Sequence, residues 1–247
     1  MSPLSPFSCD AHEVVHIHYR VFSSPLGDLY LVRSEQGVVM VTWPGKASRL
    51  LPCLSSMRGV VVEEDGAELE ALYSELQAYL AGEREELVWP IDDRLMRGDL
   101  QQQVLRLISG IPRGAVMSYR GVAEALGRPQ AVRAVAQALG KNPLAIVIPC
   151  HRIIGSDGSL TGYAGGLERK STLLALEGIP LQTRGKKIYI DRQQMHVGWW
   201  NSRRYCRPDC PSLPQNPPGN TLLLSRQLDP ARLGFTPCPV CHPESAS

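Results

Sequence analysis

The chain has 247 residues, of which 43% are hydrophobic and 20% charged, and its formal net charge is +2. This composition indicates a soluble globular protein, long enough for two compact domains or for one domain with an appendage. No apolar run approaches the ~20 residues that a transmembrane helix needs, and the N-terminus lacks the basic and apolar regions of a secretory signal, so we expect a cytoplasmic protein without a membrane partner.

The first third of the chain carries the signals of a small α+β domain. Residues 1–13 are expected to form a flexible tail. From Val14 to Trp43 apolar side chains alternate between turn signals, which predicts a three-stranded antiparallel meander. A leucine stripe predicts a helix over 67–81. We therefore place an N-terminal α+β domain at 14–97.

The next segment, 98–183, is expected to form a second domain around a helix-turn-helix. One helix is expected at 101–110. Ser118 is a suitable N-cap for a helix over 119–127, and another helix follows at 130–139 after a tight turn that contains glycine. One face of that last helix carries the alanines Ala131, Ala134 and Ala138. Such a face suits either close approach to a nucleic-acid groove or packing against a neighbouring helix, and the spacing alone favours neither.

A cysteine and a histidine come together directly after an apolar run. Residues 144–148 are expected to form a strand that ends at Pro149 and presents Cys150 beside His151. A thiol is a good nucleophile only as the thiolate, and a neighbouring imidazole or positive charge lowers its pKa. An isolated cysteine is more often a small buried hydrophobe. The surrounding motifs favour the reactive thiol.

The last part of the chain is predicted to be an appended module. We expect a helix at 167–176, a linker at 184–195 and a tail at 196–247. The tail has too few core residues to fold without a crosslink such as a disulfide or a bound metal. From Lys186 onward there are eight Lys/Arg against four Asp/Glu. This excess suits an anionic partner such as a phosphate backbone, and a bias of this size is also common on a solvated surface.

Four of the seven cysteines lie in this tail and can provide such a crosslink. Their Cys-x3-Cys and Cys-x2-Cys spacing suits tetrahedral zinc, and the odd total in a chain without a signal argues against a disulfide framework. The expected ligands of a structural Zn²⁺ are Cys206, Cys210, Cys238 and Cys241. His196 and His242 are close enough in the sequence to be alternative ligands.

Several short motifs lie between residues 14 and 180. Each is weak evidence by itself, but their occurrence together in this order is specific. They are Ser24-Pro25-Leu26-Gly27, Ser118-Tyr119, Arg133-Ala134, Asn142-Pro143, Ile148-Pro149-Cys150-His151-Arg152, Tyr163 with Gly165-Gly166-Leu167, and Glu177-Gly178. Together they resemble the O6-alkylguanine-DNA alkyltransferases. The resemblance implies an α+β fold: a ribonuclease H-like N-terminal domain and a winged helix-turn-helix-like alkyltransferase domain, here followed by an appended small zinc module.

The resemblance also implies a single-turnover DNA repair reaction. An alkyl group on O6 of guanine, or on O4 of thymine, in duplex DNA would pass to Cys150 after the damaged base rotates out of the stack. Because the damaged DNA itself is the alkyl donor, no S-adenosylmethionine would be needed. The implied partner is double-stranded DNA that contains O6-alkylguanine, bound by a monomer.

Five residues match the family's catalytic positions. Cys150 matches the alkyl acceptor, His151 would activate it through a bridging water, and Glu177 would hold the far side of the imidazole. Asn142 matches an asparagine that organises the loop around the cysteine. Tyr119 matches a tyrosine that crowds the phosphate of the flipped nucleotide and donates a hydrogen bond to the departing guanine.

Other residues match positions that contact DNA and the base. In the family the second helix of the helix-turn-helix enters the minor groove, where Ala131 and Ala134 would fit. Arg133 matches the arginine that fills the gap left by the extruded base. The implied base-binding loop is Tyr163, Ala164 and Gly165. Many relatives carry serine at the position of Ala164, so here the contact to O6 would come from the backbone amide.

The tail resembles the metal-binding domain of Ada-type adaptive-response proteins, in which that domain usually precedes the alkyltransferase. There the first cysteine accepts methyl groups from phosphotriesters, and Cys206 occupies that position. The favoured alternative is a structural zinc module that helps to hold DNA through Arg203, Arg204 and Arg207. Relatives with zinc in the first domain use a cysteine where Ser34 aligns, so we expect no zinc there.

Two other functions stay open on the residues alone. A DNA-binding protein in which Cys150 is inert would bind lesions without a covalent product. A thiol hydrolase that uses Cys150 and His151 would turn over small esters or peptides, and it would leave the helix-turn-helix without a purpose. Both rank behind alkyl transfer.

Overall fold

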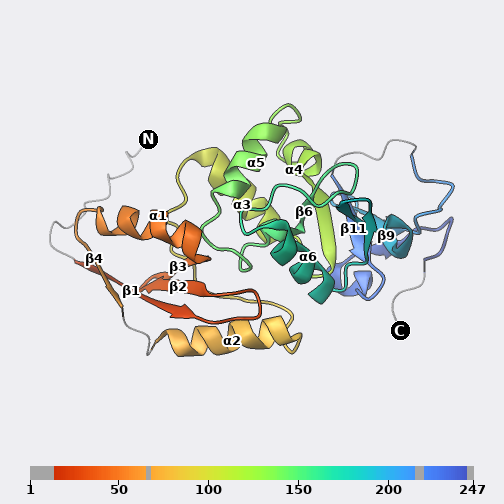
Figure 1. The fold of residues 1–247 in the computed structure, drawn as a ribbon. Coiled ribbons are helices and arrows are strands. Elements are labelled where there is room, and N and C mark those ends of the chain that lie inside the picture. The colour runs from red at the N-terminus through yellow and green to blue at the C-terminus, as the bar shows by residue number, and fades with distance from the viewer. Residues whose placement is uncertain (1–13, 65–67, 215–219, 244–247) are drawn as a thin grey trace, which may run out of the picture.

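The computed structural model describes residues 14–64, 68–214 and 220–243, so the tail expected at 1–13 lies outside the described residues. The N-terminal sheet, the helices of the second domain and the C-terminal strands follow one another across the molecule (Figure 1). Among the described residues, no helix combines the length and the hydropathy that crossing a bilayer requires.

The first domain is a four-stranded sheet with a helix on each face (Figure 1). The predicted antiparallel meander is present as β1 (Val15–Phe22), β2 (Leu29–Ser34) and β3 (Gly37–Thr42). Because side chains alternate along a strand, Val32 packs on the side of α1 (Pro44–Ser55), whereas Leu31 packs on the side of α2 (Leu69–Ala81).

Two elements of this domain were not predicted from the sequence. The helix α1 contains Pro52 and has no side-chain cap, and β4 (Val60–Glu64) ends in two glutamates. β4 pairs in parallel with β1, and α1 is the crossover that makes this parallel pairing possible. The helix α2 matches the leucine stripe expected at 67–81.

The second domain contains the predicted helix-turn-helix. Its elements are α3 (Asp99–Ser109), β5 (Ala115–Ser118), α4 (Tyr119–Ala125), α5 (Val132–Gly140), the 3-10 turn η1 (Cys150–Arg152), β6 (Ile153–Ile154) and α6 (Leu167–Leu176). Ser118 caps α4 as expected, because its Oγ accepts a hydrogen bond from Gly121 N at 2.9 Å.

Residues 144–148 do not form the strand that we expected. Leu144 makes one parallel bridge with Val41 of β3, and the chain then turns, with Ile146 at a φ of 71°. In this bridge Val41 N donates to Pro143 O at 3.0 Å, and Ala145 N donates to Val41 O at 2.8 Å. The run is apolar because it is buried against the first domain, which therefore positions the segment leading to Cys150.

The tail is built directly onto the sheet of the second domain. Its strands are β9 (Met195–Trp199), β10 (Arg204–Cys206), β11 (Thr221–Ser225) and β12 (Thr236–Pro237), with a 3-10 turn η3 at Pro230–Leu233. The sheet order is β12-β10-β9-β11-β5-β6, and Leu223 of β11 lies opposite Val116 of β5. Leu222 and Leu224 are fully buried in the core that also contains Cys150.

The segment expected to act as a linker, 184–195, has regular structure. The hairpin formed by β7 (Leu181–Arg184) and β8 (Lys187–Ile190) leads into the 3-10 turn η2 (Arg192–Gln194). Ile190 and Met195 are buried with Val116 of β5. The chain therefore passes from the second domain into the tail along a packed path.

Because Leu224 is fully buried in the shared core, we expect Leu224→Ala to lower the free energy of unfolding by about 2–5 kcal/mol. Urea unfolding followed by tryptophan fluorescence measures this loss. Leu167→Ala, at a leucine that is 45% exposed, is the matched control and should change little. A separate early transition of the tail, with the main transition unmoved, would contradict a shared core.

Candidate active site and cysteine cluster

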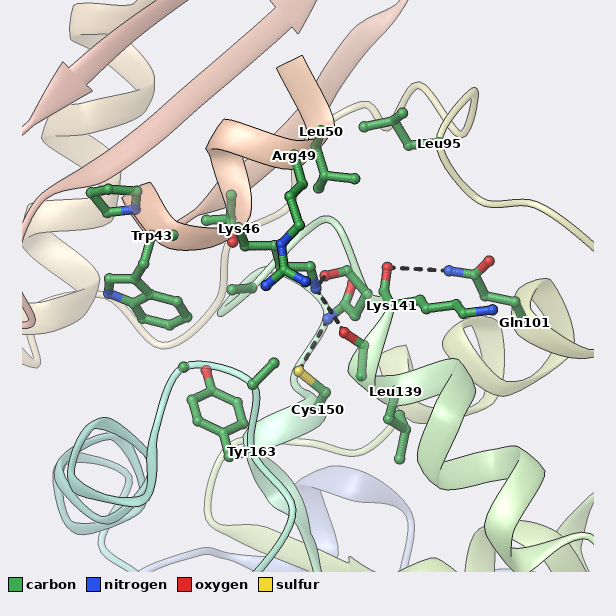
Figure 2. Close-up of a pocket in the computed structure, with 18 of the residues that line it drawn as sticks. Trp43, Lys46, Arg49, Leu50, Leu95, Gln101, Leu139, Lys141, Cys150 and Tyr163 are labelled. Carbon is green, nitrogen blue, oxygen red and sulfur yellow. Dashed lines mark hydrogen bonds between the residues drawn. The ribbon is translucent and has the colours of Figure 1, made fainter. Parts of the chain in front are cut away.

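Cys150 begins a tight turn that follows Pro149. The residue is only 8% exposed, and Asn142, which follows α5, donates a hydrogen bond to its Sγ over 3.1 Å (Figure 2). Asn142 also donates to Ile148 O at 2.9 Å and accepts from Leu144 N at 3.0 Å. One side chain therefore fixes both the loop and the direction of the thiol.

Behind the cysteine lies a buried network around Glu177. Its Oε1 lies 2.7 Å from Nε2 of His151, and its two oxygens accept hydrogen bonds from Nε and Nη2 of Arg152, both at 2.9 Å. Tyr79 of α2 donates a further hydrogen bond to the same carboxylate. Nδ1 of His151 is buried without a hydrogen-bond partner among the described residues. One imidazole nitrogen is thus held by the acid, and the other is available to take a proton.

Burial and charge set the protonation states of these groups. Burial alone would raise the pKa of Glu177, but His151 and Arg152 outweigh it and hold that pKa far below its usual range. Burial lowers the pKa of His151 in spite of the carboxylate, and burial raises the pKa of the Cys150 thiol. The resting site therefore pairs a neutral thiol with a neutral imidazole that can act as a base.

Cys150 faces a cavity of about 820 Å³ between α1, the end of α5 and the loop at residues 163–165 (Figure 2). All three residues expected to bind the base, Tyr163, Ala164 and Gly165, line this cavity. The ring of Tyr163 meets Trp43 edge-on with centroids 5.9 Å apart. A Cβ at Gly165 would lie 2.6 Å from the Trp43 ring, so the loop needs glycine there. The volume suits a small organic ligand.

Tyr119 and the residues expected to face DNA lie outside this lining. The Tyr119 hydroxyl donates at 2.8 Å to Gly162 O, directly before the loop expected to bind the base, and burial raises the pKa of Tyr119 to about 12. Arg133 is exposed on α5, whereas Ala131 and Ala134 are half-buried. Tyr119 therefore links α4 to the cavity, and Arg133 projects from the helix expected to enter a groove.

Three contributors to the site had no signal in the sequence. Lys46 of α1 donates a hydrogen bond to the carbonyl of Asn142 at 2.5 Å. Lys170 of α6 is fully buried, and this burial lowers its pKa to about 8. Tyr79 comes from α2. Each lies in an element remote from Cys150 along the chain, so no local spacing marks it.

Four buried cysteines lie at the other end of the six-stranded sheet that contains β5 and β6, and their sulfur atoms are within 4.8 Å of one another. They are Cys206, Cys210, Cys238 and Cys241. Four sulfurs bound ~2.3 Å from a tetrahedral ion lie ~3.8 Å apart, so the cluster fits such an ion. His196 instead packs against Tyr205, with ring centroids 5.3 Å apart.

Two family models match the chain. Residues 17–92 match the ribonuclease-like domain of 6-O-methylguanine DNA methyltransferase, and residues 99–179 match its DNA binding domain. The C-terminal strands β9–β12 lie beyond both matched ranges.

Curated relatives and solved structures agree with these models. The methylated-DNA–protein-cysteine methyltransferase of Mycobacterium leprae is 42% identical over 166 residues, and that of Mycobacterium tuberculosis H37Rv is 39% identical over 167 residues; each match covers 65% of this chain and 92% of the relative. A crystal structure of Mycobacterium tuberculosis OGT in complex with DNA is 38% identical, with a TM-score of 0.55 and the same coverage of 65% and 92%. The chain therefore belongs to the methylated-DNA–protein-cysteine methyltransferase family.

Proposed function

We propose that the protein repairs duplex DNA by moving the alkyl group of O6-alkylguanine, and of O4-alkylthymine, to Cys150 in a single turnover. The observation that carries this proposal is a buried cysteine that lines a cavity and is followed directly in the chain by His151, whose imidazole is held by Glu177. The damaged DNA is the alkyl donor, so S-adenosylmethionine has no part in the reaction. We propose that a monomer acts in the cytoplasm on nucleoid DNA.

The resting thiol must lose its proton before it can attack. The free Nδ1 of His151 is the base in this proposal, with a bridging water between it and Cys150. Glu177 stabilises the imidazolium that forms, because it already holds Nε2 at 2.7 Å. Asn142 keeps the sulfur directed at the cavity through its 3.1 Å hydrogen bond.

In the transfer step Sγ of Cys150 attacks the alkyl carbon, the sulfur–carbon bond forms and the carbon–O6 bond breaks. The Tyr119 hydroxyl donates a hydrogen bond to the departing guanine, which avoids a full negative charge on the base. The product is a thioether, which is not hydrolysed in water at neutral pH. Each chain therefore reacts once.

Base flipping is assigned to the exposed face of the helix-turn-helix. Arg133 occupies the gap that the rotated base leaves, and the alanines at positions 131 and 134 allow α5 to approach the minor groove. Tyr163, Ala164 and Gly165 then enclose the flipped base beside the sulfur. The exposure of Arg133 and the position of the 163–165 loop in the cavity wall support this assignment.

The first test is peptide mass spectrometry after mixing the protein with duplex DNA that contains O6-methylguanine. We expect one added methylene on the Cys150 peptide and none in Cys150→Ser. Cys53→Ser is the matched control, because this exposed cysteine lines the same cavity, and it should react normally. Retained transfer in Cys150→Ser would sink the assignment, and lesion binding without any adduct would favour the non-catalytic DNA-binding alternative.

Replacing Glu177 should weaken the fold as well as the reaction. In Glu177→Gln the buried Arg152 loses its counter-charge, so we expect a loss of about 3–5 kcal/mol in the free energy of unfolding at pH 7. The folded pKa of Glu177 is depressed, so its stabilisation is complete above its ordinary pKa of ~4.3 and declines as the pH falls below that value.

Urea unfolding at pH 7 and near pH 3 measures both effects. The gap between the wild type and Glu177→Gln should narrow at the lower pH, and Glu168→Gln, at an exposed position of the same helix, should behave as the wild type. An equal gap at both pH values would show that the charge of Glu177 is not what stabilises the fold.

We further propose that the four-cysteine cluster holds a structural Zn²⁺. Bound zinc would hold four thiolates and so connect β10, the segment after it and the segment that follows β12. Cys206 is only 1% exposed, which favours a structural role over methyl acceptance from phosphotriesters. Arg204 and Arg207 beside it are exposed, which supports an accessory contact with DNA.

Elemental analysis should find one zinc per chain, and Cys206→Ser or a strong chelator should remove it and lower the melting temperature. Cys53→Ser should keep its zinc. Incubation with methylphosphotriester DNA should leave the Cys206 peptide unmodified. A methyl group on Cys206 would instead assign the cluster as a second repair site.

A further inference from the structure

The hairpin formed by β7 and β8 is basic and lies beyond both ranges that the family models match. Residues 181–190 include three cations and no acidic residue. These cations are Arg184, Lys186 and Lys187, which lie at or beside the turn of the hairpin and are exposed. The segment therefore concentrates positive charge that the alkyl transfer proposed above does not use.

One face of the hairpin is apolar and the other is charged. Leu181, Ile188 and Ile190 pack in an apolar cluster of the second domain. Because side chains alternate along a strand, Arg184 and Lys187 lie on the opposite face, where they are direct cross-strand partners. Like charges directly opposite each other are destabilising, so this arrangement favours an anion bound between them.

No carboxylate forms an ion pair with this charged face in the part of the chain that the structure describes. The guanidinium of Arg184 lies 5.5 Å from the centroid of the neutral Tyr189 ring. Asp157 and Asp191 line the same hollow as Arg184. Their carboxylates instead accept hydrogen bonds from backbone amides of their own turns, at 3.0 and 3.2 Å. The three cations are thus left for a ligand from outside the chain.

The hairpin is also joined to the segment that leads into the loop expected to bind the base. Leu160 N donates to Ile188 O at 2.8 Å, beside an antiparallel bridge between Ser159 and Tyr189. Because antiparallel segments run in opposite directions, the residues after Leu160 lie on the side of the residues before Ile188. The basic turn is therefore directed along residues 161–162, toward the loop expected to bind the base.

This direction brings the cations to the path of the damaged DNA strand. In the proposed reaction the flipped base is enclosed by residues 163–165 and stays joined to its strand, so the phosphates that flank it lie outside the cavity, next to the same loop. Arg184, Lys186 and Lys187 do not line the cavity either. Backbone phosphates are the anions that a group of exposed lysines and arginines binds on DNA.

We infer that the β7–β8 hairpin is a second DNA-binding element, in which Arg184, Lys186 and Lys187 contact the backbone phosphates beside the flipped nucleotide. The inference rests on the alkyl transfer proposed above and adds a contact from outside the two matched domains. Phosphate contacts fix the position of a duplex and carry no sequence information, so the hairpin strengthens binding without selecting a sequence.

The first experiment measures the salt dependence of equilibrium binding to a duplex that contains O6-methylguanine, by fluorescence anisotropy. Cys150→Ser serves as the background, so that no transfer occurs during the measurement. The triple variant Arg184→Gln/Lys186→Gln/Lys187→Gln should lower the slope of log affinity against log salt concentration by about 2 to 3, because each lost phosphate contact removes about 0.9. Its affinity at low salt should fall at least about tenfold.

The second experiment separates binding from chemistry in proteins that retain Cys150. Single-turnover methyl transfer is followed with the protein in excess over the duplex. In the triple variant the protein concentration that gives half the maximal rate should rise, whereas the maximal rate should change less than about twofold, because the hairpin does not line the cavity. The variant Arg184→Lys/Lys186→Arg/Lys187→Arg keeps the charges and should behave as the wild type.

The matched control removes the same number of charges from exposed positions of the first domain. Arg20→Gln/Arg58→Gln/Arg84→Gln should keep the salt dependence of the wild type. An equal fall of the slope in this control would overturn the inference, because net charge alone would then account for the effect.

Two further outcomes would also overturn the inference. One is an unchanged slope in the hairpin variant. The other is a lower maximal rate with an unchanged slope, which would show that the hairpin shapes the loop and does not contact DNA. Absence of any methyl transfer by the wild type would reject the proposed alkyl transfer instead, and in that case the salt dependence of binding still decides whether the hairpin contacts DNA.

Discussion

The rest of the structure depends on one buried carboxylate. Glu177 at the end of α6 pairs with His151 and accepts hydrogen bonds from Arg152 and from Tyr79 of α2, so both domains and the turn that carries Cys150 meet at it. A buried carboxylate without partners would cost several kcal/mol, and the guanidinium and the phenol offset that cost. The orientation of the His151 imidazole is therefore set by contacts between elements that are distant in the sequence. The position of His151 directly after Cys150 would not be enough to fix this orientation.

The C-terminal strands reach the same point from another side. Ser225 of β11 donates through its hydroxyl to Gly178 O at 2.6 Å and through its backbone N–H to Gly114 O at 2.7 Å. Gly178 has a φ of 73°, a left-handed backbone conformation that favours glycine over residues with a Cβ. The turn after Glu177 is thus enclosed by the segment that also carries the four cysteines. The strands that carry the cluster and the strands β5 and β6 of the second domain belong to one six-stranded sheet, which therefore connects the cluster with the turn that carries Cys150.

The features that could be predicted from sequence are those with a local signal. Alternating apolar residues and turn signals predicted the meander of β1, β2 and β3, and apolar stripes predicted the main helices. The structure confirms these strands and helices. The helix α1 was missed because Pro52 interrupts the usual pattern, and the run at 144–148 resembles a strand because its burial comes from the first domain. Sequence motifs singled out Asn142, His151 and Glu177, whose roles stay predictions. No local signal marked Tyr79 and Lys170, since only the tertiary fold brings them to the site. The tail has few core residues of its own because β11 shares the core of another domain.

The charges around Cys150 resolve an apparent conflict between a buried thiol and a nucleophile. At rest, burial raises the pKa of the cysteine and lowers that of His151, so neither group carries a charge. Transfer of one proton between them, as proposed, creates a thiolate and an imidazolium at the same time. The imidazolium forms against the carboxylate of Glu177, and the thiolate forms within reach of the Lys46 and Lys170 charges, both of which favour it. Because these compensating charges are already in place, each ion of the proposed pair would form next to a group of opposite charge. In the proposed transfer, a thiol that is neutral at rest would thus become a nucleophile by passing one proton to His151.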